Sequence, residues 1–188
     1  MSDILNIMQY HKFTGIIINR HIVKESDRFL TIYTLEEGKI SVYARGVRSV
    51  KSKRGSQIDL FSHIRFELFE KNDRRTLTSV ELLDGHHISK TSLANISRLF
   101  QIGELVDRLT VEHDPHEEVY ELLVTALANL SRFETPEYLL RFKVRLLYLL
   151  GYLTSLEDWS TGLPENMTLD AYIDTLLDRP LRPKLALH

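Results

Sequence analysis

Hydrophobic and polar residues alternate with a period of two over the first half of the chain. Residues 27–35 show this most clearly, because Phe29 and Tyr33 fall on one side and Leu30 and Ile32 on the other. Such alternation is typical of strands. Similar runs, bounded by polar turns, occupy residues 14–22, 39–45, 58–70 and 75–83. The pattern therefore predicts five short strands, the longest of which has to bend, and Gly38 in a turn where a positive φ is tolerated.

From about residue 90 the apolar period lengthens to that of a helix. Apolar residues recur at Leu93, Ile96, Leu99, Val106 and Leu109. Signals for helix starts are Ser92, Asp114 with Pro115, Thr135 with Pro136, and Thr168, and Gly151 is a stop signal. Caps of these types lie just outside helix ends, and proline is favoured in the first turn. We therefore predict helices over 92–109, 114–133, 135–151 and 168–178.

These periods predict an α+β chain with two domains. Five strands are too few for a sandwich, so residues 1–88 are expected to form a small antiparallel barrel. The long connector between its third and fourth strands is a feature of the oligonucleotide-binding (OB) fold, which binds nucleic acid on its strands and flanking loops. Residues 89–188 are expected to form an all-helical domain.

The composition indicates a cellular compartment and shows that charge is distributed unequally between the two halves of the chain. The 188 residues include 43% hydrophobic and no cysteine, which fits a soluble protein of a reducing compartment, the cytoplasm. No apolar run is long enough for a signal peptide or a membrane span. The net charge is −2, yet residues 1–90 hold 15 basic and 11 acidic side chains, whereas residues 91–188 hold 9 and 15. A basic half favours binding to a polyanion.

The connector at residues 44–54, ARGVRSVKSKR, concentrates that charge. It holds no acid and five basic side chains: Arg45, Arg48, Lys51, Lys53 and Arg54. Such side chains neutralise phosphates, and nearby aromatic rings stack on bases. Tyr33, Tyr43 and Phe61 lie on or beside the flanking strands, although strand aromatics commonly serve packing alone. A solvated surface loop is the plainer interpretation, but such loops normally mix both signs of charge.

Other polar clusters point to no chemistry. Glu25 and Asp27 fit a hydrogen-bonded turn better than a metal or acid–base pair. His86–His87 and His113 with His116 have metal-like spacing but no further ligand, so they are interpreted as interdomain or surface residues. The sequence carries no phosphate-binding loop, zinc-protease motif or nucleophile elbow. No enzyme activity and no cofactor are therefore predicted.

An ordered series of motifs resembles the bacterial DNA repair and recombination mediator family RecO. It comprises a Gly15–Ile17 strand, ESDR at 25–28, EEGKIS and ARG.R..KS within 34–52, ELVDRL at 104–109 and LLRFKVRLLYLLGY at 139–152. The resemblance covers about residues 12–153. It implies an OB barrel followed by helices, binding to single- and double-stranded DNA, and annealing of complementary strands. It also implies three partners: RecR, the single-stranded-DNA-binding protein (SSB), and RecA, which is loaded onto SSB-coated DNA.

The resemblance also assigns residues. The connector cations and Tyr43 become the DNA contacts, with Arg28 and Lys39 as secondary candidates. The acidic, apolar tail of SSB requires cations beside an apolar pocket, for which we select Arg141, Lys143 and Arg145. The alternative is that these cations pair with Glu134 or Glu137 on the same helix.

Two departures qualify the resemblance. Many members have a four-cysteine zinc site that this chain lacks, and the chain is shorter than usual, which puts contacts with RecR in question. The competing hypothesis is a protein-interaction adaptor whose barrel binds peptide rather than DNA.

Overall fold

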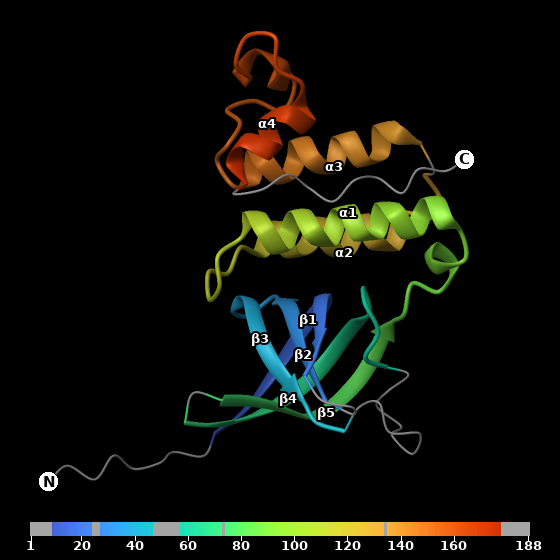
Figure 1. Ribbon diagram of the computed structural model, residues 1–188, viewed down its shortest axis with the longest axis vertical. Coiled ribbons are helices and arrows are strands. Elements are labelled where there is room, and N and C mark those ends of the chain that lie inside the picture. The colour runs from blue at the N-terminus through green and yellow to red at the C-terminus, as the bar shows by residue number, and fades with distance from the viewer. Residues whose placement is uncertain (1–8, 24–26, 47–56, 73, 134, 178–188) are drawn as a thin grey trace, which may run out of the picture. The chain divides into compact units, whose positions relative to one another are not determined.

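The computed structural model describes residues 9–23, 27–46, 57–72, 74–133 and 135–177 (Figure 1). These residues fall into two compact units. The first comprises the strands up to residue 85 together with the short segment Glu112–Pro115. The second comprises residues 86–111 and the chain from residue 116 onward.

The first unit is a closed barrel of five strands, as predicted. The strands are β1 (Gln9–Ile22), β2 (Arg28–Thr34), β3 (Gly38–Ala44), β4 (His63–Lys71) and β5 (Arg74–Asp84). They are ordered β1-β2-β3-β5-β4 around the barrel, and only the β3–β5 pairing is parallel. Residues near the start of β1 pair with β4 and those near its end with β2, so this long strand closes the sheet. The arrangement matches the predicted OB fold.

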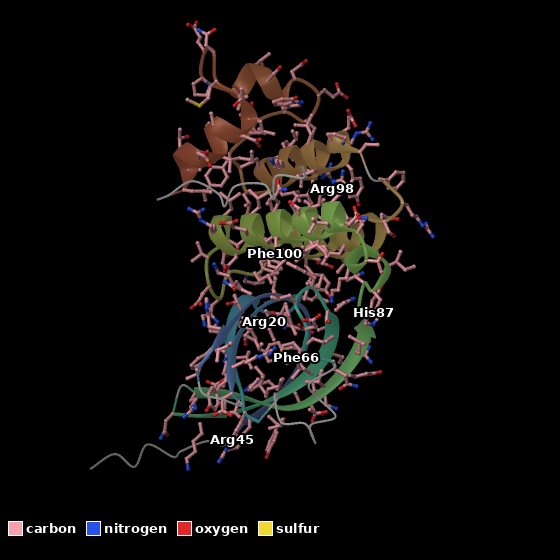
Figure 2. The ribbon with its side chains drawn as sticks, turned by 45° about the vertical axis from the view of Figure 1, so that its right-hand side comes forward. Arg20, Arg45, Phe66, His87, Arg98 and Phe100 are labelled. Carbon is pink, nitrogen blue, oxygen red and sulfur yellow. The ribbon has the colours of Figure 1, made fainter. Side chains whose placement is uncertain are left out.

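The alternating pattern fills the barrel with apolar side chains. Phe13 and Phe66 stack at 5.6 Å in the core, and Figure 2 shows Phe66 inside the barrel. Further core residues from all five strands include Ile17, Leu30, Ile32, Ile40, Val42, Ile64, Leu68 and Leu77. Burying each such side chain contributes about 1.5–3 kcal/mol. The core therefore accounts for the strand periodicity of the sequence.

The fourth strand is shorter than the sequence pattern predicted. It begins at His63 rather than at residue 58, because the backbone of Phe61 has a φ of 65° and leaves the extended conformation. The Phe61 N–H donates to the carbonyl of Ile17 at 2.8 Å, and Ile58 is buried in the core. The apolar residues before the strand thus pack against the barrel without extending its sheet, and the long bent strand predicted over residues 58–70 does not form.

The segment Glu112–Pro115 packs against the edge of β3 rather than starting a helix. The His113 N–H donates to the Lys39 carbonyl at 3.0 Å, and the Ser41 hydroxyl donates to the Glu112 carboxylate at 2.9 Å. Gly38 lies so close that a Cβ there would be 2.3 Å from the Asp114 carbonyl oxygen. The prediction that Asp114 caps a helix and Pro115 begins it is therefore wrong by two residues, because the cap is His116 and the first helical residue is Glu117.

The second unit contains the four predicted helices. They are α1 (Leu93–Leu109), α2 (Glu117–Asn129), α3 (Pro136–Leu149) and α4 (Leu169–Leu176), with 3-10 turns at Ile88–Lys90 and Trp159–Gly162. Helix α3 packs against both α1 and α2 (Figure 1). The buried faces consist mainly of leucine, with Leu99, Leu105, Leu123, Leu127 and Leu147 among the most enclosed.

Several helix ends follow their sequence signals. The Thr168 hydroxyl accepts a hydrogen bond from the Ala171 N–H at 3.2 Å, which caps α4. Pro136 occupies the first turn of α3 after Thr135. Gly151, at a φ of +78°, ends α3 as predicted, because it lets the Tyr152 N–H return to the Leu147 carbonyl at 2.8 Å.

Candidate nucleic-acid interface

A cavity lies at the barrel wall beside the end of β3, where Asp27 before β2 and Asn72 after β4 are among the lining residues. We call it the basic cavity. Its volume is about 590 Å³, and it is lined by Asp27, Tyr43, Arg45, Phe69, Lys71, Asn72, Arg74 and Thr76. The β1–β2 and β4–β5 connections and the β3 wall are where OB folds generally take oligonucleotides. Figure 2 shows Arg45 at one end of the barrel and outside its core.

Asp27 is the acid of the basic cavity, and both of its carboxylate oxygens accept hydrogen bonds. One accepts from the Gly46 N–H at 2.8 Å, and the other accepts from the Tyr43 hydroxyl. This donation to the carboxylate raises the pKa of Tyr43 above its usual range, and desolvation adds to the effect. Asp27 therefore fixes the backbone at the start of the basic connector, while Glu25 lies outside the described residues.

Arg74 and Lys71 enter the basic cavity from either side of the β4–β5 turn. The Arg74 guanidinium carbon lies 4.0 Å from the centre of the Tyr43 ring, a cation–π stack. Arg74, Lys71 and Arg45 are all exposed, and none pairs with a carboxylate within the described part of the chain. The neighbouring Arg75 differs, because it binds Glu37 at 2.5 Å and Glu70 at 3.0 Å. Sequence reasoning missed Arg74 and Lys71, although basic residues flanking the turn KNDRR were a signal for them.

The predicted DNA contacts are placed in different environments. Arg45 lines the basic cavity. Tyr43 also lines it but is only 8% exposed beneath Arg74. Arg28 is half-buried opposite Ala44, and Lys39 lies at the far end of β3 beside the segment Glu112–Pro115. The remaining four lie outside the described residues: Arg48, Lys51, Lys53 and Arg54.

The aromatic residues that the sequence suggested for base stacking are buried. Tyr33 is fully enclosed and Phe61 is 3% exposed, so neither ring face is open to a base. Two other aromatic side chains of the barrel strands are exposed to solvent, Phe29 to 41% and Tyr10 to 71%. The packing interpretation therefore holds for Tyr33 and Phe61.

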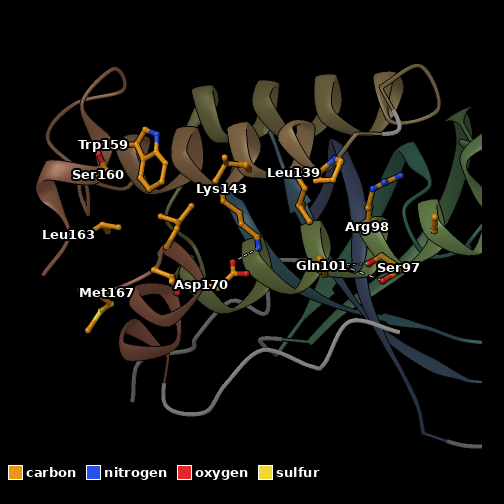
Figure 3. Close-up of a pocket in the computed structure, with 15 residues that line it drawn as sticks. Ser97, Arg98, Gln101, Leu139, Lys143, Trp159, Ser160, Leu163, Met167 and Asp170 are labelled. Carbon is orange, nitrogen blue, oxygen red and sulfur yellow. Dashed lines mark hydrogen bonds and ion pairs between the residues drawn. The ribbon is translucent and has the colours of Figure 1, made fainter. Parts of the chain in front are cut away.

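The three cations predicted for the SSB tail do not share one surface. Arg141 and Arg145 are exposed, whereas Lys143 is 4% exposed and its ammonium binds Asp170 at 2.5 Å. Figure 3 shows this pair in a cavity of about 630 Å³ between α1, α3 and the segment before α4, with Trp159 at its side. Residues two apart on a helix face in different directions, which explains the separation.

Arg141 and Arg145 line a third cavity, which we call the tail groove. It measures about 640 Å³, and its wall is largely apolar, with Leu122, Ala126, Phe133, Tyr138, Phe142 and Leu156. Phe133 and Tyr138 stack at 5.5 Å. Glu137 also lines the groove, and its backbone hydrogen bond, its contact with Thr135 and the charge of Arg141 lower the pKa of its carboxyl. The groove thus combines apolar surface with two guanidinium groups.

The histidines that the sequence analysis singled out lie in different surroundings. His113 lies 3.4 Å from the Glu37 carboxylate, and His86 is buried. No group of three metal-ligating side chains occurs among the residues with a described position.

No helix in the described ranges is both long and apolar enough to cross a membrane.

Comparison with known proteins gives the same division of the chain. A family model described as Recombination protein O N terminal matches residues 8–86, and one described as Recombination protein O C terminal matches residues 90–160. Three relatives are each named DNA repair protein RecO. That of Symbiobacterium thermophilum is 33% identical over 151 residues, which is 79% of this chain and 60% of the relative. The relative from Acetivibrio thermocellus is 29% identical over 147 residues, which is 77% of this chain and 59% of the relative. The relative from Listeria monocytogenes is 30% identical over 141 residues, which is 74% of this chain and 55% of the relative.

The chain thus spans between 55% and 60% of the length of these three relatives. The two family models nevertheless match in the order in which the barrel and the helices occur, and they cover most of the chain. The chain therefore belongs to the RecO family of DNA repair proteins.

Proposed function

We propose that the barrel binds DNA through the basic cavity and through the cationic connector that follows Arg45 in the sequence. The observation that carries this proposal is the charge around the cavity. Three exposed cations, Arg45, Lys71 and Arg74, surround one acid whose oxygens already accept two hydrogen bonds. Four further cations follow in the connector: Arg48, Lys51, Lys53 and Arg54. Phosphates are the ligands that such a surface attracts.

Annealing follows from the same charge without any bond-making group. Two DNA strands repel each other, and a cationic surface lowers that repulsion while it raises the local concentration of both strands. The family models that match this chain and the names of its relatives support a role in DNA repair. We extend the proposal to a cytoplasmic mediator that acts with RecR and helps load RecA on SSB-coated DNA.

The tail groove is the proposed docking site for the acidic tail of SSB. Its apolar wall suits an aromatic side chain, and Arg141 and Arg145 suit the carboxylates. Lys143 leaves the proposed site because it is buried against Asp170. Changing both arginines to glutamine should weaken binding of an acidic, aromatic-ended peptide about tenfold, or by about 1.4 kcal/mol. Equal binding by this variant and the unaltered chain would reject the groove as the site.

Salt dependence of DNA binding tests the main proposal. Fluorescence anisotropy of a labelled single strand is measured against salt for the unaltered chain and for Arg45→Gln/Lys71→Gln. Removal of two phosphate contacts should make the slope of the logarithm of the binding constant against the logarithm of the salt concentration shallower by about 1.4. Arg65→Gln is the matched control, because Arg65 is an exposed barrel cation that pairs with Glu81 and lies outside the cavity. An unchanged slope in the double variant contradicts the assignment, and peptide binding without DNA binding favours the adaptor alternative.

A further inference from the structure

A row of side chains crosses the outer surface of the barrel beside the basic cavity. Tyr10 of β1 pairs with Phe69 of β4, and Phe69 pairs with Thr76 of β5. Thr76 in turn pairs with Tyr43 of β3, and Tyr43 pairs with Phe29 of β2. Cross-strand partners lie on the same face of a sheet. The row therefore contains four aromatic residues, one on each of four strands, and a threonine in its middle position on β5.

The row faces outward because its sequence neighbours face inward. Leu68, Val42 and Leu30, each adjacent to a member of the row, belong to the buried core. Successive strand residues point to opposite faces. Tyr10 and Phe29 are accordingly exposed, at 71% and 41%.

The rings also contact one another in pairs. Tyr10 and Phe69 lie 5.3 Å apart, and Phe29 and Tyr43 are separated by the same distance. The guanidinium carbon of Arg74, an exposed residue, lies 4.0 Å from the centre of the Tyr43 ring. Single exposed hydrophobic residues are ordinary, whereas this row brings two ring pairs together. The rings are tilted by 50° in the Tyr10–Phe69 pair and by 57° in the Phe29–Tyr43 pair, so the row offers separate ring faces rather than one plane. Bases stack on aromatic rings and on guanidinium planes alike.

The row and the basic cavity overlap. Phe69, Thr76 and Tyr43 line the cavity together with the cations Arg45, Lys71 and Arg74. A ligand that covers both surfaces needs negative charges next to flat, apolar faces, and a nucleic acid strand has this combination. Four strand spacings of about 4.8 Å separate Tyr10 from Phe29, so the row is long enough for several nucleotides.

We propose that this row, Tyr10–Phe69–Arg74/Tyr43–Phe29, is a base-stacking track that makes the barrel select single-stranded DNA over duplex. The inference rests on the proposed DNA binding and adds the strand form. Phosphates are accessible in both forms, so the cations alone bind either. Base faces are open only in a single strand, because in a duplex they stack on each other. A base that stacks on the track keeps its pairing edge open to a complementary strand, which suits annealing.

The test uses the full chain with Tyr10→Leu/Phe69→Leu, which keeps apolar side chains but removes two rings. Binding is measured to an oligonucleotide of about 12 nucleotides, within the range that OB folds cover, and to its duplex. Affinity for the single strand should fall about tenfold, whereas duplex affinity should change less than about twofold. The slope against salt should stay the same, because no charge is removed. Tyr148→Leu is the control, since Tyr148 is an exposed ring on α3.

The outcomes separate this inference from the proposed function. Equal losses on both DNA forms, or no loss on the single strand, overturn the stacking track but leave DNA binding intact. Absence of DNA binding by the unaltered chain overturns both. Tyr10→Leu alone is a second test that does not disturb the core, because Tyr10 is 71% exposed, and it should show a smaller loss confined to the single strand.

Discussion

Gly38 and Gly46 offer a matched pair of substitutions that tests how the barrel holds the segment Glu112–Pro115. Both glycines have a φ of +67°, a conformation that is unfavourable for alanine by about 1–2 kcal/mol. A Cβ at Gly46 meets no atom of the described residues within 4 Å. A Cβ at Gly38 lies 2.3 Å from the Asp114 carbonyl oxygen, which is backbone and has to shift.

The magnitude follows from what that shift breaks. Displacement of the segment removes the hydrogen bond from His113 to the Lys39 carbonyl and the one from Ser41 to Glu112. Each contributes about 0.5–1.5 kcal/mol. Gly46→Ala should therefore cost about 1–2 kcal/mol through backbone strain alone. Gly38→Ala should cost about 1–3 kcal/mol more than Gly46→Ala.

Urea denaturation followed by circular dichroism compares the two variants, and amide hydrogen exchange adds a local readout. The His113 amide should lose protection in Gly38→Ala and keep it in Gly46→Ala, because only the first substitution displaces the segment. Equal destabilisation by the two substitutions, with His113 still protected, would refute this account of the packing.

Three further predictions concern charges inside each unit. Burial opposes ionisation of Glu37, but the hydrogen bonds and charge of Arg75, with a contribution from His113, outweigh it and lower the Glu37 pKa. A carboxyl whose pKa is lowered by folding contributes stability at pH values above its unfolded pKa, and this contribution is lost as the pH falls. The stability difference between the unaltered chain and Arg75→Gln should therefore shrink from pH 7 to pH 3 in thermal melts. Asp170→Asn should cost about 1.5–3 kcal/mol, since it leaves the Lys143 ammonium buried without its carboxylate, and Lys143→Met should cost less in the same urea titration. Asp27→Ala removes the acceptor of the Tyr43 hydroxyl and should lower the pKa of that phenol in an ultraviolet titration; an unchanged value means that the hydrogen bond does not form in solution.

Local patterns predicted most of the fold because the barrel core selects one face of every strand. Leu30 and Ile32 are buried and alternate with the less buried Phe29 and Thr31. Thr168 marks a helix start through its side-chain hydroxyl, and Gly151 marks a helix end through its positive φ. The errors arose where tertiary contacts outweigh local preference. Asp114 and Pro115 resemble a helix start, but the backbone there is held against Gly38.

The candidate site was only partly predictable. Arg45 could be recognised because its charge is shared by sequence neighbours, whereas Lys71 and Arg74 join it only after the barrel closes. The aromatic row depends on which residues of different strands are paired, and a single strand's sequence holds no such information. Lys143 illustrates the opposite error, since proximity in sequence to Arg141 and Arg145 does not place it on their surface.

The position of bound DNA on the barrel tests the central claim most directly. Amide chemical shifts of the isotope-labelled chain are recorded as a single-stranded oligonucleotide is added to saturation. We expect the largest changes at residues that line or adjoin the basic cavity, among them Tyr10, Arg45, Phe69, Lys71 and Arg74. Saturating binding that leaves these amides unchanged and shifts only residues of the helical unit would contradict the account.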